Sequence, residues 1–150
     1  MKFTLSWLNE HIQLSKSSEE ISNTLTSLGL EVEELINLNA HAKNFIVCKI
    51  KKVIKHPNAD RLKICEVNTG YENFKVVCGA SNAVEGLISI FAPNGTYIPG
   101  MKFILKKKSI RGVEGDGMLC SEKELNLPET IDGIIELNSN YRIGSSLDKY

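Results

Sequence analysis

From residue 45 onward the chain is a series of short runs of β-branched and aromatic residues, each ended by a turn signal. Runs of this kind, separated by Gly, Pro or Asn, are typical of strands joined by tight turns. In the first run, residues 45–54, Ile46, Cys48, Ile50 and Ile54 alternate with lysines, so we expect these four to face a core. Further strands are expected at residues 62–67, 74–78, 87–91, 103–105 and 134–137.

Several short strands and one short helix, expected at residues 121–125 with Ser121 as its cap, favour a compact β-barrel. A five-stranded barrel of the OB type fits this pattern. An SH3-like barrel fits it equally well, because periodicity alone does not separate the two. The predicted fold class is mainly β with short helices.

A helix is expected near the N-terminus. Ser17 and Glu20 have the spacing of a capping box, in which each side chain bonds the backbone amide of the other residue. Apolar residues then recur on one helical face as far as Leu28, and Gly29 supplies a left-handed stop.

Residues 30–36 alternate apolar and acidic side chains, a pattern that predicts a half-buried strand. Residues 1–38 thus form a small α+β segment, which is too short to bury much surface alone. We therefore predict two parts, this segment as a piece of a larger domain and a barrel over residues 39–150.

The charge is distributed unevenly, although 18 basic and 18 acidic residues cancel. Residues 43–111 hold 13 basic and 4 acidic groups, a net +9, whereas residues 1–42 carry −4 and residues 112–150 carry −5. The basic residues gather in a first basic cluster (residues 43–63) and a second basic cluster (residues 102–111). If the fold brings them together, they form one patch that attracts phosphates; the alternative is two solvated strand faces.

Membrane and secretory segments are not expected. No apolar run approaches the roughly 20 residues of a transmembrane helix, and the N-terminus is too polar for a signal peptide, which predicts a cytoplasmic protein. The four cysteines have no Cys-x-x-Cys spacing, which argues against zinc. We expect buried thiols.

No catalytic constellation is evident. The three histidines are far apart, and we expect His56, beside Pro57, to be a surface turn residue. Residues 112–117 are rich in glycine but lack the ending of a phosphate-binding loop, which predicts a flexible loop. Glu114 and Asp116 are only a weak signal for a cation. We predict no catalytic residue and no metal site.

Four ordered motifs resemble the tRNA-binding OB domain of methionyl-tRNA synthetases, the endothelial-monocyte-activating polypeptide and the bacterial phenylalanyl-tRNA synthetase β subunit. They are HPNADRL at residues 56–62, VCGASN at 77–82, IRGV at 110–113 and GMLCSE at 117–122. The leader resembles the start of the β subunit specifically, through MKFTLSWL at residues 1–8 and LGLEVE at 28–33. Two departures are Ser81, where the family usually has Pro, and Gly115, where it often has Ser.

The resemblance implies an N-terminal fragment of a longer β subunit, containing an auxiliary tRNA-binding module. The family's parent enzyme joins phenylalanine to tRNA-Phe with ATP and Mg²⁺, as a heterotetramer of two α and two β chains. It implies no catalytic site and no cofactor within residues 1–150. An architectural domain that packs β or α/β chains with little tRNA contact is the alternative, and a free-standing tRNA-binding or chaperone-like protein is a third.

The expected tRNA contacts lie on the outward strand face and the nearby loops. Lys and Arg neutralise phosphates, and Asn and Ser reach sugar hydroxyls. Among the aromatic residues, Tyr71 and Tyr97 are expected to be exposed and Phe45, Phe74, Phe91 and Phe103 to be in the core. The predicted contacts are Lys49, Lys51, Lys55, Asn58, Arg61, Lys63, Ser81, Asn82, Lys106, Lys108, Arg111 and Ser121.

Overall fold

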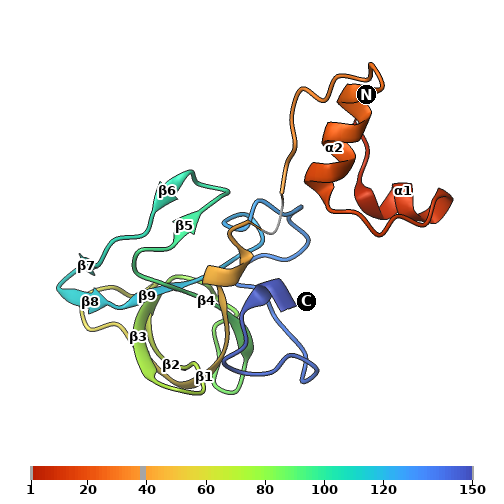
Figure 1. The fold of residues 1–150 in the computed structure, drawn as a ribbon. Coiled ribbons are helices and arrows are strands. Elements are labelled where there is room, and N and C mark those ends of the chain that lie inside the picture. The colour runs from red at the N-terminus through yellow and green to blue at the C-terminus, as the bar shows by residue number, and fades with distance from the viewer. Residues whose placement is uncertain (1, 38–39, 150) are drawn as a thin grey trace. The chain divides into compact units, whose positions relative to one another are not determined.

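The computed structural model describes residues 2–37 and 40–149, and its chain divides into two compact units, Met1–Asn37 and Leu38–Tyr150 (Figure 1). The predicted boundary between residues 38 and 39 lies outside the described residues. Across the part of the chain that is described, no helix has the length and apolar character needed to cross a membrane.

The N-terminal unit contains helices α1 (Leu5–His11) and α2 (Ser18–Ser27). The predicted capping box of α2 is confirmed: the Ser17 amide donates to the Glu20 carboxylate at 2.9 Å, and the Glu20 amide donates to Ser17 Oγ at 3.2 Å. Gly29 ends the helical region with φ +87°, as expected. Helix α1 was not predicted, although Thr4 caps it by accepting from the Trp7 amide at 3.2 Å.

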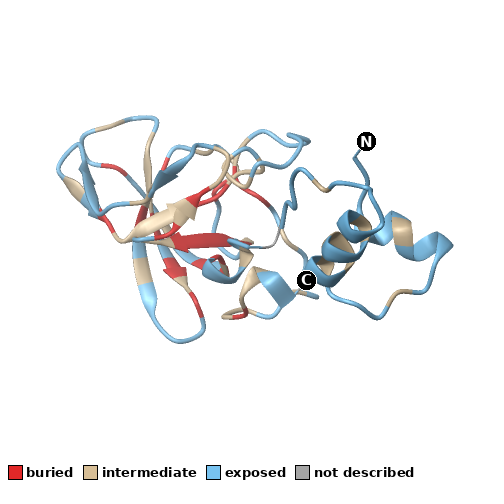
Figure 2. Ribbon diagram, turned by 45° about the horizontal axis from the view of Figure 1, so that its top comes forward, coloured by how far each residue is buried: buried red, intermediate tan, exposed pale blue. Residues whose placement is uncertain are grey.

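None of the described residues 2–37 is buried (Figure 2). The strand expected at residues 30–36 is wrong, because these residues form no regular secondary structure. A strand needs a neighbouring strand for its backbone hydrogen bonds, and the described part of this unit offers none. Residues 30–36 therefore have the alternating sequence of a strand but no neighbouring strand among the described residues with which to form hydrogen bonds.

The second unit is mainly β, as predicted. Its antiparallel sheet has five strands in the order β3-β2-β1-β4-β9, with two hairpins, β5–β6 and β7–β8, between β4 and β9 (Figure 1). The strands are β1 (Ile46–Lys55), β2 (Lys63–Asn68), β3 (Asn73–Cys78), β4 (Ile88–Pro93), β5 (Tyr97–Ile98), β6 (Phe103–Ile104), β7 (Lys108–Ile110), β8 (Val113–Gly115) and β9 (Gly117–Leu119); 3₁₀ turns cover Ala42–Asn44 and Leu147–Lys149.

The two ends of the sheet meet through Asp116, which precedes β9. Its amide donates to the Lys75 carbonyl on β3 at 2.8 Å, and its carboxylate accepts from the Lys75 amide at 3.2 Å. This exchange ties β3 to the β8–β9 junction. The five-stranded barrel is therefore nearly closed.

Figure 2 shows that the buried residues of the chain lie on the barrel strands and the segments beside them. Phe91 is fully buried, and its ring stacks on Phe74 with the ring centroids 4.9 Å apart. All four cysteines are free and buried, as expected, and burial raises the pKa of Cys48 to about 12. The core residues form two clusters: Cys48, Ile50, Cys65, Val67, Val76, Cys78, Ala83, Phe91, Leu119 and Ile134, and then Phe45, Ile90, Ala92, Ile98, Cys120 and Ile135.

Strand β1 does not keep one alternation along its whole length. Its pairing with β2 shifts register between Ile50 and Lys52, which marks a β-bulge. Beyond the bulge Val53 is half-buried and Ile54 is 48% exposed. The prediction that Ile54 faces the core is wrong, because one inserted residue turns the following side chains to the other face.

Two other expected elements are absent. Residues 121–125 form turns instead of a helix, although the Glu124 carboxylate accepts from the Ser121 amide at 2.6 Å as in a helix cap. Asn126 follows in the left-handed region, with φ +58°, and this conformation stops a right-handed helix. The strand expected at residues 134–137 is reduced to one bridge between Leu137 and Ile88.

Candidate nucleic-acid interface

Two side chains of the β1–β2 loop join it to the β7–β8 turn. His56 Nε2 lies 3.1 Å from the Ile110 carbonyl oxygen, and Asn58 Nδ2 donates to the Arg111 carbonyl at 3.1 Å. We call these two hydrogen bonds the loop clasp. The clasp therefore places the β1–β2 loop end of the first basic cluster beside the β7–β8 turn, which belongs to the second basic cluster.

His56 is only 2% exposed, so the expected surface position is wrong. The Asn58 amide donates to Nδ1 at 3.0 Å, which makes Nδ1 an acceptor. Nε2 therefore carries the hydrogen and donates to the Ile110 carbonyl. Both ring nitrogens are satisfied, and His56 connects the two loops.

The β7–β8 hairpin turns at Arg111 and Gly112, since Ile110 pairs with Val113. Both turn residues have positive φ, +49° and +87°, as in the type I′ turns that suit β-hairpins. A left-handed conformation is unfavourable for a residue as large as arginine. The clasp bond from Asn58 to the Arg111 carbonyl helps to hold it, with the Arg111 side chain exposed.

The lysines of the second basic cluster divide into two kinds. Lys107 lies 3.2 Å from a Glu114 oxygen and 3.8 Å from an Asp116 oxygen, so its charge is partly neutralised. Lys106 and Lys108 are exposed and form no ion pair within residues 2–37 and 40–149. This difference leaves Lys106 and Lys108 available to a phosphate.

The first basic cluster is spread along β1 and its loop. Lys49, Lys51 and Arg61 are exposed, and Lys51 lies at the bulge. Lys55 pairs with Asp60 at 2.9 Å, but both side chains are largely exposed, so the pair contributes little and opens readily. Lys49 lies about 20 Å from Lys55 along the strand, which places it well away from the clasp.

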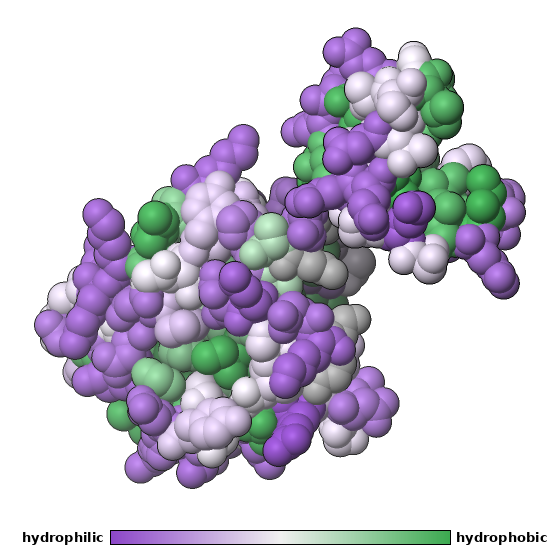
Figure 3. Space-filling view, viewed as in Figure 1, coloured by the Kyte–Doolittle hydropathy of each residue, from purple (hydrophilic) through white to green (hydrophobic). Residues whose placement is uncertain are grey.

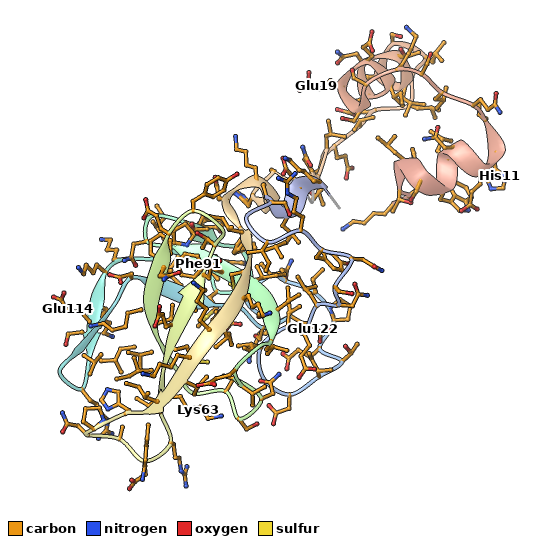
Figure 4. All side chains as sticks on the ribbon, turned by 90° about the horizontal axis from the view of Figure 1, so that it is seen from below. His11, Glu19, Lys63, Phe91, Glu114 and Glu122 are labelled. Carbon is orange, nitrogen blue, oxygen red and sulfur yellow. The ribbon has the colours of Figure 1, made fainter. Side chains whose placement is uncertain are left out.

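Besides Asn58, three more of the predicted contacts already bind other parts of the protein. Lys63 is half-buried, and its ammonium donates to the carbonyls of Ser81 and Ala83 at 2.8 and 2.9 Å (Figure 4). The Asn82 amide donates to the Ile134 carbonyl at 2.8 Å and accepts from the Ile134 amide at 3.0 Å.

The third is Ser121, whose hydroxyl donates to the Glu124 carboxylate. Ser81, also among the predicted contacts, is exposed, with its carbonyl bound to Lys63. These four positions therefore shape loops of the barrel, in contrast to the solvent-facing lysines.

The aromatic residues are only partly as predicted. Phe45 and Phe91 are in the core and Phe74 packs against it, but Phe103 is 38% exposed, so the expectation of a buried Phe103 is wrong. Tyr71 is 85% exposed, as expected. Tyr97 is half-buried, with its ring 4.7 Å from that of His41.

The prediction that the glycine-rich residues 112–117 form a flexible loop is wrong, because they contain β8 and the start of β9. A side chain at Gly117 would place its Cβ 2.4 Å from the Ala92 carbonyl oxygen, so glycine is needed there for close packing. Glu114 and Asp116 face Lys107, and the described residues contain no group of three or more ligands able to hold a metal.

A cavity of about 440 Å³ opens beside β3 and β9, with an acidic rim that includes Glu122, Glu124 and Asp132. Hydrogen bonds from Thr130 lower the pKa of Glu122, so this carboxylate stays charged. A cavity with this charge repels phosphate. It lies outside the basic region defined by the clasp.

The comparisons with known proteins agree with the fold. Residues 45–146 match the family model described as "Putative tRNA binding domain". A methionyl-tRNA-synthetase-related protein from Pyrococcus horikoshii superposes with a TM-score of 0.53 at 28% identity, over 75% of this chain and 97% of that protein.

Curated relatives extend the similarity to both units. The phenylalanine–tRNA ligase β subunit of Rickettsia bellii is 48% identical over 150 residues, covering 100% of this chain and 17% of the relative. That of Nitrobacter winogradskyi is 46% identical over 152 residues, covering 97% of this chain and 19% of the relative. The chain thus spans less than a fifth of these relatives, and it belongs to the tRNA-binding domain family, in the form found in phenylalanine–tRNA ligase β subunits.

Proposed function

We propose that the barrel binds the phosphate backbone of tRNA through the two basic clusters joined by the loop clasp. The clasp carries this proposal, because it turns residues about 50 positions apart into one cationic surface. Lys and Arg neutralise phosphates and release counterions, which favours binding without strong sequence preference. The proposed phosphate contacts are Lys49, Lys51, Lys55, Arg61, Lys106, Lys108 and Arg111.

The remaining predicted contacts support this surface from within the protein. Asn58 holds the turn that presents Arg111, and Lys63 holds the loop that contains Ser81 and Asn82. Asn82 is bound to Ile134 and Ser121 to Glu124, so we propose that these two residues do not contact RNA directly and only maintain the shape of their loops.

We further propose that the chain serves a phenylalanine–tRNA ligase, as an auxiliary module that adds affinity for tRNA-Phe. Its relatives in two bacteria carry that name over nearly all of this chain. In this proposal the α subunit is the partner, in a heterotetramer of two α and two β chains in the cytoplasm. We propose that amino-acid activation with ATP and Mg²⁺ takes place in other parts of that enzyme.

The exposed apolar residues of the N-terminal unit indicate a role other than tRNA binding. Trp7, Ile12, Leu28 and Leu30 are between 51% and 73% exposed, and Figure 3 shows apolar surface on this unit. Exposed apolar patches of this kind mark surfaces that pack against other protein. We propose that this unit is architectural, as a piece of a larger domain of the β chain.

The test of tRNA binding is a salt titration of the 150-residue chain with tRNA-Phe. We expect affinity to fall steeply as salt rises, and the slope of log K against log salt to become shallower by about 1.5 in a Lys106→Ala/Lys108→Ala variant. Lys16→Ala, in the N-terminal unit, is the matched control and should leave the slope unchanged. Absence of binding at low salt would overturn the proposal.

A further inference from the structure

The β5–β6 hairpin lies in the longest acid-free part of the chain. No Asp or Glu occurs between Glu85 and Glu114, and this stretch contains five basic residues from Lys102 to Arg111. Of these five, Lys107 forms ion pairs with Glu114 and Asp116. The hairpin and the segment that follows it therefore carry basic residues and no acidic ones.

The backbone of the hairpin is firmly held. The Lys102 amide donates to the Ile98 carbonyl and the Leu105 amide to the Thr96 carbonyl, both at 2.8 Å. Ile98 is fully buried in the core and anchors β5. The Gly100 amide donates to the Glu124 carbonyl at 2.9 Å, and a Cβ at Gly100 would overlap the Lys123 carbonyl, which shows how closely the turn is packed.

The turn and the second strand of the hairpin nevertheless present apolar side chains to solvent. Met101 is 52%, Phe103 38% and Ile104 56% exposed. Phe103 lies directly across from Ile98, yet only Ile98 reaches the core. Lys102 precedes Phe103 and Lys106 follows Ile104 after one residue, and apolar surface lies beside hydrophilic atoms over this hairpin in Figure 3.

Tyr71 is more exposed than Phe103, but its surroundings are different. It lies in the β2–β3 turn beside Glu72, and the β2 strand that leads to this turn carries Glu66. An acidic neighbour repels phosphates, so an aromatic ring there is poorly placed for RNA. Phe103 combines an exposed ring, a fixed backbone and flanking cations.

We propose that the β5–β6 hairpin is a stacking platform for unpaired nucleotides of tRNA. A base stacks on the exposed part of the Phe103 ring, and Lys102 and Lys106 neutralise the adjoining phosphates. Stacking accepts any base, because every base has a π-face. This inference rests on the proposed function and adds a contact with bases to its contacts with phosphates.

The test uses a Phe103→Ala variant of the 150-residue chain, with Tyr71→Ala as the matched exposed-aromatic control. We expect Phe103→Ala to weaken binding of single-stranded RNA about tenfold without changing the salt slope, since stacking releases no counterions. Binding of fully paired RNA should be unaffected. Tyr71→Ala should bind like the wild type, and a thermal melt of each variant should show the unchanged barrel.

A second variant gives a direct reading of stacking. Phe103→Trp in a Trp7→Phe background carries one tryptophan, on the hairpin, and its fluorescence should be quenched by single-stranded RNA. If the wild type binds RNA with the expected salt slope but Phe103→Ala binds equally well and the fluorescence of the Phe103→Trp variant does not change, the platform is wrong and the phosphate surface stands.

If the wild type binds no RNA at low salt, both proposals fail. If Phe103 instead governs binding to anionic lipid vesicles and not to RNA, the hairpin is a membrane contact and the platform is overturned.

Discussion

The two units of the chain differ in burial far more than in local sequence signals. Helix α2 has a complete capping box and a glycine stop, yet none of the described residues 2–37 is buried. The barrel contains short strands with weak individual signals, and its interior holds two buried clusters.

This contrast separates what starts an element from what stabilises a domain. A helix of ten residues is marginal by itself in water, whatever its caps. The barrel strands persist because they close on one another and bury Val, Ile, Phe and Cys side chains. The unit with the clearer local signals is thus expected to be the less stable one.

The largest expected effect is a core substitution in the barrel. Phe91→Ala should lower the free energy of unfolding by about 3–5 kcal/mol, because it removes a fully buried ring that packs on Phe74. Trp7→Ala in the N-terminal unit should change it by less than about 0.5 kcal/mol.

The measurement is urea denaturation followed by circular dichroism, since the single tryptophan lies outside the barrel. If Phe91→Ala does not fold, Phe91→Leu should still cost about 1 kcal/mol. Equal losses for Trp7→Ala and the Phe91 variants would contradict the contrast between the units.

The next effect compares two lysines within the barrel. Lys63→Met should lower the free energy of unfolding by about 2 kcal/mol, because its ammonium satisfies two loop carbonyls. Lys49→Met should leave stability nearly unchanged and weaken tRNA binding instead. Chemical denaturation and tRNA titration of both variants check this division, and the same profile for both lysines would refute it.

A smaller effect on stability is expected for the loop clasp. Asn58→Ala should cost about 1 kcal/mol of stability and weaken tRNA binding several-fold, because Arg111 loses its support. In an Arg111→Ala background the same substitution should no longer affect binding. Asn73→Ala, which removes hydrogen bonds to Glu66 and Asn68 away from the clasp, is the control. Additive effects of Asn58 and Arg111 would argue against the clasp.

The smallest effect is the pH dependence of α2. The Ser17 amide lowers the pKa of Glu20 below its ordinary value of 4.5, so the charged carboxylate favours the helix. This stabilisation is complete well above pH 4.5 and is lost as pH falls below it. Amide chemical shifts of residues 18–27 should lose helical character on acidification, less so in Glu20→Gln, whose side chain does not titrate, and barrel shifts should remain.

Features that depend on neighbouring residues were predicted well from the sequence. The capping box, the Gly29 stop and the main barrel strands follow from caps, turns and alternation over a few positions. Predictions failed where distant segments decide. One inserted residue at the β1 bulge exposes Ile54, and a contact 54 positions away buries His56.

The candidate site shows the same limit. Charge clustering located Lys106, Lys108 and Arg111, but the sequence does not show that Lys63 and Asn82 are used up by internal hydrogen bonds. Phe103 was expected in the core because its type is usually buried, whereas its hairpin extends past the core. The absence of acidic residues between Glu85 and Glu114 is the sequence feature that could have indicated the exposed β5–β6 hairpin as a binding surface.

The most direct test of the difference between the two units, and of the proposed tRNA surface, is amide hydrogen exchange along the whole chain, with and without tRNA-Phe. We expect fast exchange in residues 2–37 and slow exchange in the barrel strands, with added protection by tRNA confined to residues 49–62 and 101–112. Equally slow exchange in both units, or protection by tRNA confined to residues 2–37, would contradict this expectation.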